Sequence, residues 1–183
     1  EGNGVVKRNE VENFLSQLEQ KDRKVLRAIG VRFGRYHIFL YKLLKPKPVM
    51  MRVILWKNYY QKYLNLNIPK FGLNFLYNGK SLNQNFMLIC GFEKFNNIYV
   101  RIDILERLFL MIFEIGKNEK KEIKLKPEML NLLGCSKENF IKLVENMDYK
   151  TYNKNDEIFF KYSPKRKFRK INEKNKITVD NPF

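Results

Sequence analysis

Acidic residues are missing from a long central part of this sequence. Between Asp22 and Glu93 the chain has no aspartate or glutamate, although it carries 19 acidic residues in all. The same residues 23–92 hold 13 lysines and arginines. Enrichment in lysine accounts for part of the net charge of +17 but not for this regional distribution. A block with one sign of charge excludes an acidic surface there and favours a polyanionic partner, either nucleic acid or an anionic membrane surface.

Residue types that carry out chemistry are scarce. The sequence has two cysteines, Cys90 and Cys135, and one histidine, His37. These three side chains are too few for a four-ligand zinc site, and we expect free thiols in a reducing compartment. The stretch GLNFLYNGKS, residues 72–81, imitates a phosphate-binding P-loop but has six residues where that motif has four. We therefore expect this segment not to be an enzyme and to hold no cofactor or metal.

Long hydrophobic runs are also absent. The most apolar segment, residues 102–115, is too short for a membrane span and is interrupted by Asp103, Glu106, Arg107 and Glu114. The start, EGNGVVKRNEVENF, has no apolar core of a signal peptide. It also has no initiator methionine, so we expect a piece of a longer, cytoplasmic chain without a membrane partner.

Hydrophobic periodicity and turn signals predict an α+β fold, mainly helical with short strands. Residues 64–80 are predicted to be a loop, and Asp103 with Glu106 resembles a capping box that starts a central buried helix. The first predicted helical segment begins at Asn9 or Asn13 and ends near Gly30. Further helices are predicted at 49–63, 82–90 (capped by Ser81), 103–115, 127–133 and 137–147 (capped by Ser136). The predicted strands are one or two within 31–41, then 98–101, 149–152 and 157–162.

The order helix, turn, helix, hairpin near the C-terminus predicts a winged-helix-like subdomain. We accordingly predict three parts: a basic helical and β accessory domain over 1–125, the winged-helix-like subdomain over 126–162, and a basic, disordered tail over 163–183. Glu138 and Glu145 make the helix 137–147 a poor match for a phosphate-walled groove, so this helix is predicted to pack rather than to read DNA.

Residues 27–48 interleave six cations with four aromatic residues. Cations neutralise phosphates and aromatic rings stack on unpaired bases, while Gly34 would let the backbone approach a phosphate. The alternative is that the apolar residues of this block are core and that the cations are a solvated rim. His37 is expected to be packed or to face phosphate rather than to be catalytic. The residues predicted to contact nucleic acid are Arg27, Arg32, Arg35, Tyr36, His37, Lys42, Lys45, Lys47, Arg52, Lys165, Arg166, Lys167, Arg169 and Lys170.

Three blocks of the chain resemble the C-terminal region of a known helicase group. They are VLRAIGVRFGRYHIFLYKLLKPKP (25–48), ICGFEKFNNIYVRIDILERL (89–108) and MLNLLGCSKENFIKLVENMDY (129–149). Together they look like bacterial DExH-type superfamily 2 helicases related to the RNA helicase of the mitochondrial degradosome, and the resemblance covers most of residues 10–162. It implies an ATP-driven, cytoplasmic RNA helicase acting beside a 3′ exoribonuclease. The P-loop, the DExH box, ATP and Mg²⁺ would belong to a preceding core, so no catalytic residue is carried over.

These observations predict a non-catalytic accessory domain that binds and positions single-stranded RNA (or DNA), with its own helicase core and a 3′ exoribonuclease as further partners. Three alternatives stay open. The segment is a protein-docking module on a helicase core or nuclease, or it is a free-standing RNA- or ribosome-binding protein. A small nuclease is the least favoured, because the carboxylates are scattered along the sequence.

Overall fold

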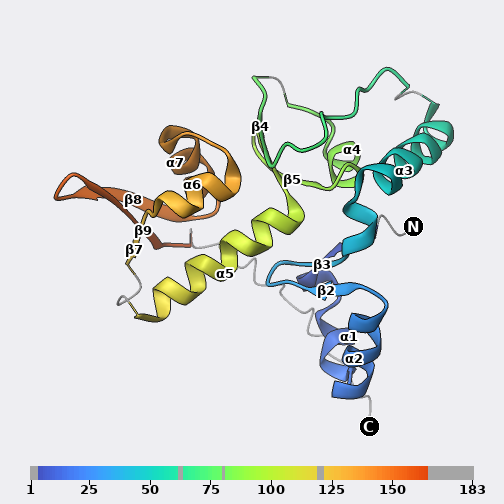
Figure 1. Cartoon of the computed structure of the whole chain (residues 1–183), viewed down its shortest axis with the longest axis horizontal. Helices are drawn as coiled ribbons and strands as arrows, with labels where there is room; N and C mark the ends of the chain where they lie inside the picture. Colours follow the sequence, from blue (N-terminus) through green and yellow to red (C-terminus); the bar gives the residue numbers. More distant parts are fainter. Residues whose placement is uncertain (1–3, 62–63, 80, 119–121, 165–183) are drawn as a thin grey trace, which may run out of the picture.

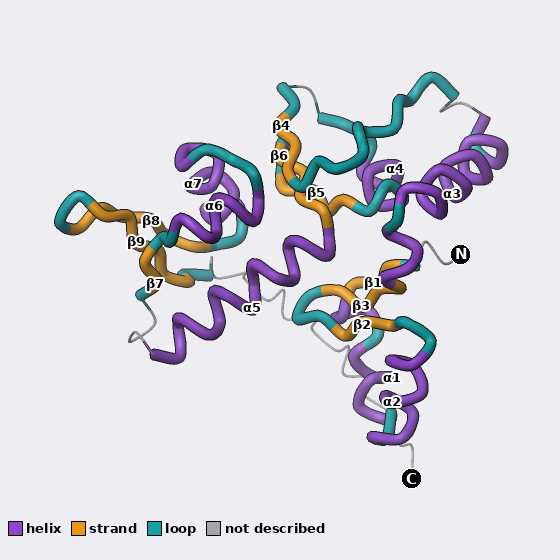
Figure 2. Tube along the Cα trace, viewed as in Figure 1, coloured by secondary structure: helices purple, strands orange, loops and turns teal. Residues whose placement is uncertain are grey.

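The computed structural model of the chain describes residues 4–61, 64–79, 81–118 and 122–164. Within these residues the fold is α+β, as predicted, with seven α-helices and three antiparallel sheets of three strands each. About half of the described residues are helical. The three sheets form separate groups along the molecule (Figure 2), and α5 (Ile102–Asn118) runs between the N-terminal and C-terminal elements (Figure 1).

The first sheet has the strand order β1-β3-β2. One or two strands are predicted within residues 31–41, and the structure has two short ones. The N-terminal helical segment, for which the sequence allows either one continuous helix or a second start at Asp22, is divided, because Glu19 and Asp22 form a capping box that starts a second helix. The elements are β1 (Val5–Lys7), η1 (Arg8–Glu10), α1 (Glu12–Gln17), α2 (Gln20–Ala28), β2 (Val31–Phe33), β3 (His37–Leu40) and η2 (Tyr41–Leu44).

The second sheet has the order β4-β6-β5 and packs against α3 and α4. The strand predicted at residues 98–101 is confirmed as β6, but the predicted loop 64–80 contains β4, which pairs with β6. Ser81 was the expected helix cap; instead the Asn83 side chain accepts the backbone N–H of Phe86 and caps α4. The elements are α3 (Pro46–Tyr59), β4 (Phe75–Tyr77), α4 (Gln84–Ile89), β5 (Phe92–Phe95) and β6 (Ile98–Arg101).

The third sheet, in the order β7-β9-β8, lies with two helices at the C-terminal end of the described chain. The helix predicted at 127–133 and the Ser136 cap of the next helix are confirmed. β7 lies before residue 126 but pairs with β9, so this sheet extends across the boundary predicted at 125. The elements are β7 (Ile123–Lys124), α6 (Pro127–Leu133), α7 (Lys137–Asn146), β8 (Tyr149–Lys154) and β9 (Glu157–Tyr162).

α5 contributes to the larger of two hydrophobic clusters. Its residues Leu105, Leu108 and Ile112 are buried together with side chains of α6, α7 and β9, as the predicted central helix requires. The burial is one-sided, since Leu110 and Phe113 remain exposed. Among the described residues, no helix combines the length and the apolar composition needed to span a membrane.

Candidate nucleic-acid interface

The loop between β2 and β3 is held against α5 by the carboxylate of Glu106. Glu106 accepts the backbone N–H groups of Arg35 (2.6 Å), Tyr36 (3.1 Å) and His37 (2.7 Å). Successive N–H groups that converge on one point form an anion-binding nest, and here the anion is a side chain of the same chain. The prediction that Glu106 caps α5 is therefore wrong. Its carboxylate binds the backbone of the β2–β3 loop and holds that loop in place.

His37 lies between two carboxylates beneath this loop. Its Nδ1 is 2.9 Å from Glu106 Oε1 and its Nε2 is 3.0 Å from Glu93 Oε2. Glu93 in turn pairs with Lys7 at 3.2 Å. His37 is only 3% exposed, so it does not reach a nucleic-acid strand in this conformation, and its prediction as a contact residue is corrected.

The two carboxylates keep the imidazole charged. Burial alone would lower the pKa of His37, but the hydrogen bonds and the negative charges of Glu106 and Glu93 outweigh burial and raise it from 6.5 to about 9. Burial would raise the pKa of Glu93, but its bond to His37 and the charges of His37 and Lys7 lower it. At neutral pH the group is a buried imidazolium between carboxylates, a structural ion network rather than a general base.

This network predicts a specific pH dependence of stability. A folded-state pKa of about 9 against 6.5 in the unfolded chain gives stability that is fully present below pH 6.5 and is lost as pH rises toward 9. The loss is on the order of 3 kcal/mol of unfolding free energy. The lowered pKa of Glu93 gives a second loss below about pH 4.5. Urea unfolding at a series of pH values measures both; a free energy that stays constant from pH 6.5 to 9 contradicts this assignment.

Gly34 is required by the close approach of the loop to Glu106. A Cβ at position 34 would stand 2.5 Å from Glu106 Oε2 and 2.7 Å from the backbone oxygen of His37. The carbonyl of Gly34 also accepts a hydrogen bond from Arg8 at 2.9 Å. We predicted that Gly34 admits a phosphate; the structure shows that it admits the carboxylate of Glu106 instead.

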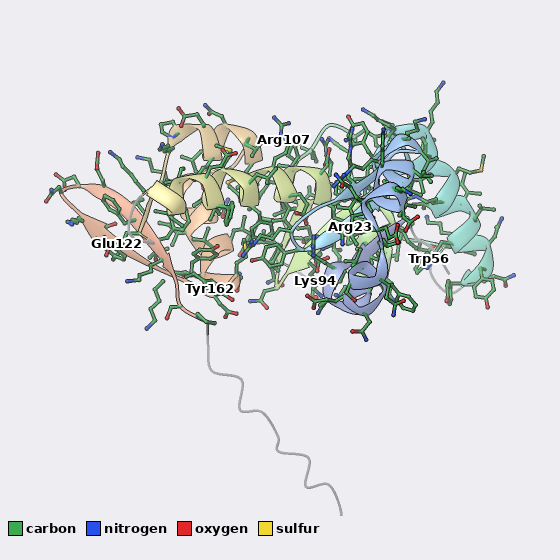
Figure 3. All side chains as sticks on the ribbon, turned by 90° about the horizontal axis from the view of Figure 1, so that it is seen from below. Arg23, Trp56, Lys94, Arg107, Glu122 and Tyr162 are labelled. Carbon is green, nitrogen blue, oxygen red and sulfur yellow. The ribbon has the colours of Figure 1, made fainter. Side chains whose placement is uncertain are left out.

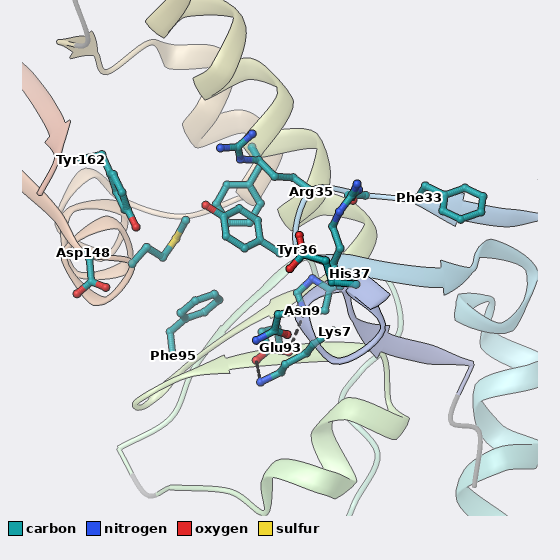
Figure 4. Close-up of a pocket in the computed structure, with 15 residues that line it drawn as sticks. Lys7, Asn9, Phe33, Arg35, Tyr36, His37, Glu93, Phe95, Asp148 and Tyr162 are labelled. Carbon is teal, nitrogen blue, oxygen red and sulfur yellow. Dashed lines mark hydrogen bonds and ion pairs between the residues drawn. The ribbon is translucent and has the colours of Figure 1, made fainter. Parts of the chain in front are cut away.

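An open groove of about 850 Å³ lies on one side of the loop (Figure 4). We call it the aromatic groove. Tyr36 packs against Phe109, with ring centroids 3.9 Å apart and ring planes tilted by 37°, and remains 40% exposed. Arg35 lies over the ring of Phe113 at 5.4 Å. Exposed rings beside a guanidinium are the features on which unpaired bases stack. The aromatic side chains that line this groove are Phe33, Tyr36, Phe95, Phe109 and Tyr162.

A second open groove, of about 540 Å³, shares Phe33 and Gly34 with the first. We call it the arginine groove. Both of its carboxylates are already engaged, since Asp103 binds Arg101 through two hydrogen bonds of 2.6 and 3.0 Å and Glu106 binds the loop. Three exposed arginines remain, and they form no ion pair among the described residues: Arg27, Arg32 and Arg107. In Figure 3 Arg107 and Tyr162, one residue of each groove, lie on opposite sides of α5.

The predicted contact residues are therefore divided. Five of them line the two grooves, although His37 is buried: Arg27, Arg32, Arg35, Tyr36 and His37. Lys42, Lys45 and Lys47 are exposed but lie outside the grooves, and half-buried Arg52 donates a hydrogen bond to the carbonyl of Leu43. The tail residues Lys165, Arg166, Lys167, Arg169 and Lys170 lie outside the described part of the chain.

Arg107 is a groove residue that the sequence analysis missed. In the sequence, Arg107 stands out only as an interruption of an apolar run. A usable signal was present, because Asp103, Arg107 and Glu114 recur at spacings of four and seven, which places them on one face of a helix. Phe95 carried no such signal, since only the tertiary fold brings it to the loop.

Both cysteines lie within the described residues and are free thiols. Burial raises the pKa of Cys90 to about 12 and that of Cys135 to about 11, so both free thiols are neutral at pH 7. The described residues contain no cluster of three side chains suited to a metal ion.

Comparisons of the chain with protein-family models, with curated proteins and with solved structures gave no match.

Proposed function

We propose that this chain is a non-catalytic accessory domain of an ATP-dependent RNA helicase, in which the β2–β3 loop positions single-stranded RNA. One observation carries the proposal: the loop separates a groove lined by five aromatic residues, of which Tyr36 and Tyr162 are exposed, from a groove with three arginines that form no ion pair among the described residues. Arginines neutralise the phosphates of the strand, and the rings of Tyr36 and its neighbours stack on its bases.

The surrounding charge supports this assignment. Residues 23–92, which include the whole loop, supply cations and no carboxylate, so the approach to the arginine groove is positive. Arg27 lies over the ring of Phe33 at 5.5 Å, which orders a guanidinium beside a ring that lines both grooves. A strand that crosses the loop meets phosphate-binding groups on one side and stacking groups on the other.

The C-terminal elements support a winged-helix-like subdomain within this proposal. α5, β7, α6, α7, β8 and β9 follow one another in that order, and the sheet order is β7-β9-β8. The exposed Glu138 and Glu145 offset Lys137 and Lys142, so α7 has no net positive charge with which to bind phosphate. In the proposed function this subdomain therefore forms a wall of the aromatic groove, through Met147, Asp148 and Tyr162, instead of inserting α7 into a nucleic-acid groove.

The resemblance to DExH-type helicases supplies the rest of the proposal. A preceding helicase core holds ATP and Mg²⁺ and performs the hydrolysis, and a 3′ exoribonuclease receives the RNA in the cytoplasm. This chain contributes binding and orientation of the strand.

Neutralising the arginine groove is expected to weaken RNA binding. In Arg32→Gln/Arg107→Gln, two phosphate contacts are lost, so the affinity for a labelled oligouridine of about 12 nucleotides should fall about tenfold or more at low salt. The slope of log affinity against log salt should become shallower by about 1.4, at about 0.7 for each phosphate. Fluorescence anisotropy over a salt series measures both quantities.

The matched control is Lys70→Gln/Lys150→Gln, which removes the same net charge from exposed positions outside both grooves. We expect its salt slope and affinity to stay close to those of the unmodified chain. Equal losses in the two double variants would mean that net charge alone holds the RNA. That result would contradict the proposed interface.

A further inference from the structure

α3 has an exposed face that is apolar where a surface helix is normally polar. Val49 and Val53 are buried on one side of the helix, against the cluster that contains Phe86 and Tyr99. On a surface helix the opposite side is expected to be charged or polar. Here five large apolar side chains are exposed instead: Met50, Met51, Ile54, Leu55 and Tyr59.

These side chains form two regular ridges. Met51, Leu55 and Tyr59 follow one another at intervals of four residues, and Met50 with Ile54 forms the neighbouring row. Rows at this spacing are the ridges between which the side chains of a second helix pack. The exposure is substantial, at 60% for Met51, 61% for Leu55 and 78% for Tyr59. α3 lies at the periphery of the molecule, away from α5 and the β2–β3 loop (Figure 1).

The charge around this face determines what fits it. α3 has no acidic residue, and the exposed Lys45 and Lys47 lie at its N-terminal end. A second copy of this chain would place two such faces together, and like charges would oppose that association. A partner helix with an apolar ridge and acidic flanks would complement both the ridges of α3 and the lysines at its N-terminal end.

We infer that α3 is a docking site for an amphipathic helix of another protein segment, one whose apolar ridge is flanked by glutamates or aspartates. The apolar ridge of this partner lies between the two rows of α3, and its acidic residues face Lys45 and Lys47. Methionines suit such a surface, because their flexible side chains adapt to the partner. The site is separate from the RNA grooves and does not depend on the proposed function.

A synthetic helical peptide of about 18 residues, with leucines at i, i+3, i+4 and i+7 and glutamates elsewhere, tests the inference. The control peptide has the same leucines with lysine in place of glutamate. Binding to the whole chain at about 0.1 M salt, where close pairs of opposite charge still attract, is followed through the methyl NMR signals of the six methionines. We expect the acidic peptide to shift Met50 and Met51 and to leave the fully buried Met87 and Met129 unchanged.

The variant Met51→Gln/Leu55→Gln should lose at least tenfold in affinity for the acidic peptide. Val25→Gln, which removes an exposed apolar side chain from α2, should retain it. Equal binding of both peptides, or undiminished binding by the double variant, overturns the inference. Self-association in sedimentation equilibrium that the double variant abolishes also overturns it, because a second copy would then be the occupant.

Discussion

Replacing Glu106 by glutamine is expected to lower the free energy of unfolding by about 3–5 kcal/mol, the cost of removing one partner from a buried ionic group. The carboxylate accepts three backbone N–H groups and one imidazole N–H. A glutamine side chain offers one carbonyl oxygen, and its NH₂ group would meet donors that need an acceptor. His37 would also lose one of the two charges that raise its pKa. Urea unfolding at pH 6 measures the loss.

The control for this variant lies on the same helix. Glu114→Gln changes the charge of α5 equally, but Glu114 is exposed and takes no part in the network. We expect its free energy of unfolding to remain within about 0.5 kcal/mol of that of the unmodified chain. A difference below about 1 kcal/mol between the two variants would mean that Glu106 does not hold the loop.

Replacing Gly34 by alanine is expected to cost about 3 kcal/mol, at the upper end of the cost of overpacking. The new Cβ would stand 2.5 Å from Glu106 Oε2 and 2.7 Å from the carbonyl oxygen of His37. Neither atom moves easily, because the carboxylate is bound by three N–H groups and the oxygen belongs to the backbone. Thermal and urea unfolding both report the loss.

Two further variants make this prediction specific. Gly79→Ala adds the same methyl group where no atom lies within 4 Å, so a change within about 0.5 kcal/mol is expected. In Gly34→Ala/Glu106→Ala the clashing carboxylate is absent. The free energy of unfolding should therefore fall by less than the sum of the losses in Gly34→Ala and in Glu106→Ala. Strict additivity would show that the two residues do not interact and would contradict the proposed role of Gly34.

Helix caps and β-branched runs in the sequence correctly predicted the helices and the strand whose limits are set by neighbouring residues. Ser136 caps α7 and Pro127 begins α6 because each acts within its own helical turn. The strand at 98–101 follows from a β-branched and aromatic run. β4 was missed because it is an edge strand of three residues, whose pairing with β6 is decided by packing.

The candidate interface was predictable only in part, because only its local features can be recognised in the sequence. The concentration of cations and aromatic residues in 27–48 singled out Arg27, Arg32, Arg35 and Tyr36, which the structure places in the two grooves. The partner of the loop could not be found in this way. Glu106 lies about 70 residues further along the chain, and its spacing from Asp103 predicts a cap. Only the approach of α5 to the hairpin turns that carboxylate into the anion of the nest.

The most direct test of the central claim is to map where single-stranded RNA touches the chain. An oligouridine of about 12 nucleotides that carries 4-thiouridine is cross-linked to the protein by ultraviolet light, and the modified peptides are identified by mass spectrometry. The account predicts cross-links at Tyr36 and Tyr162 in the aromatic groove, and none at Tyr59 of α3, although Tyr59 is the most exposed of the three. Cross-links confined to α3 or to residues 165–170 would contradict it.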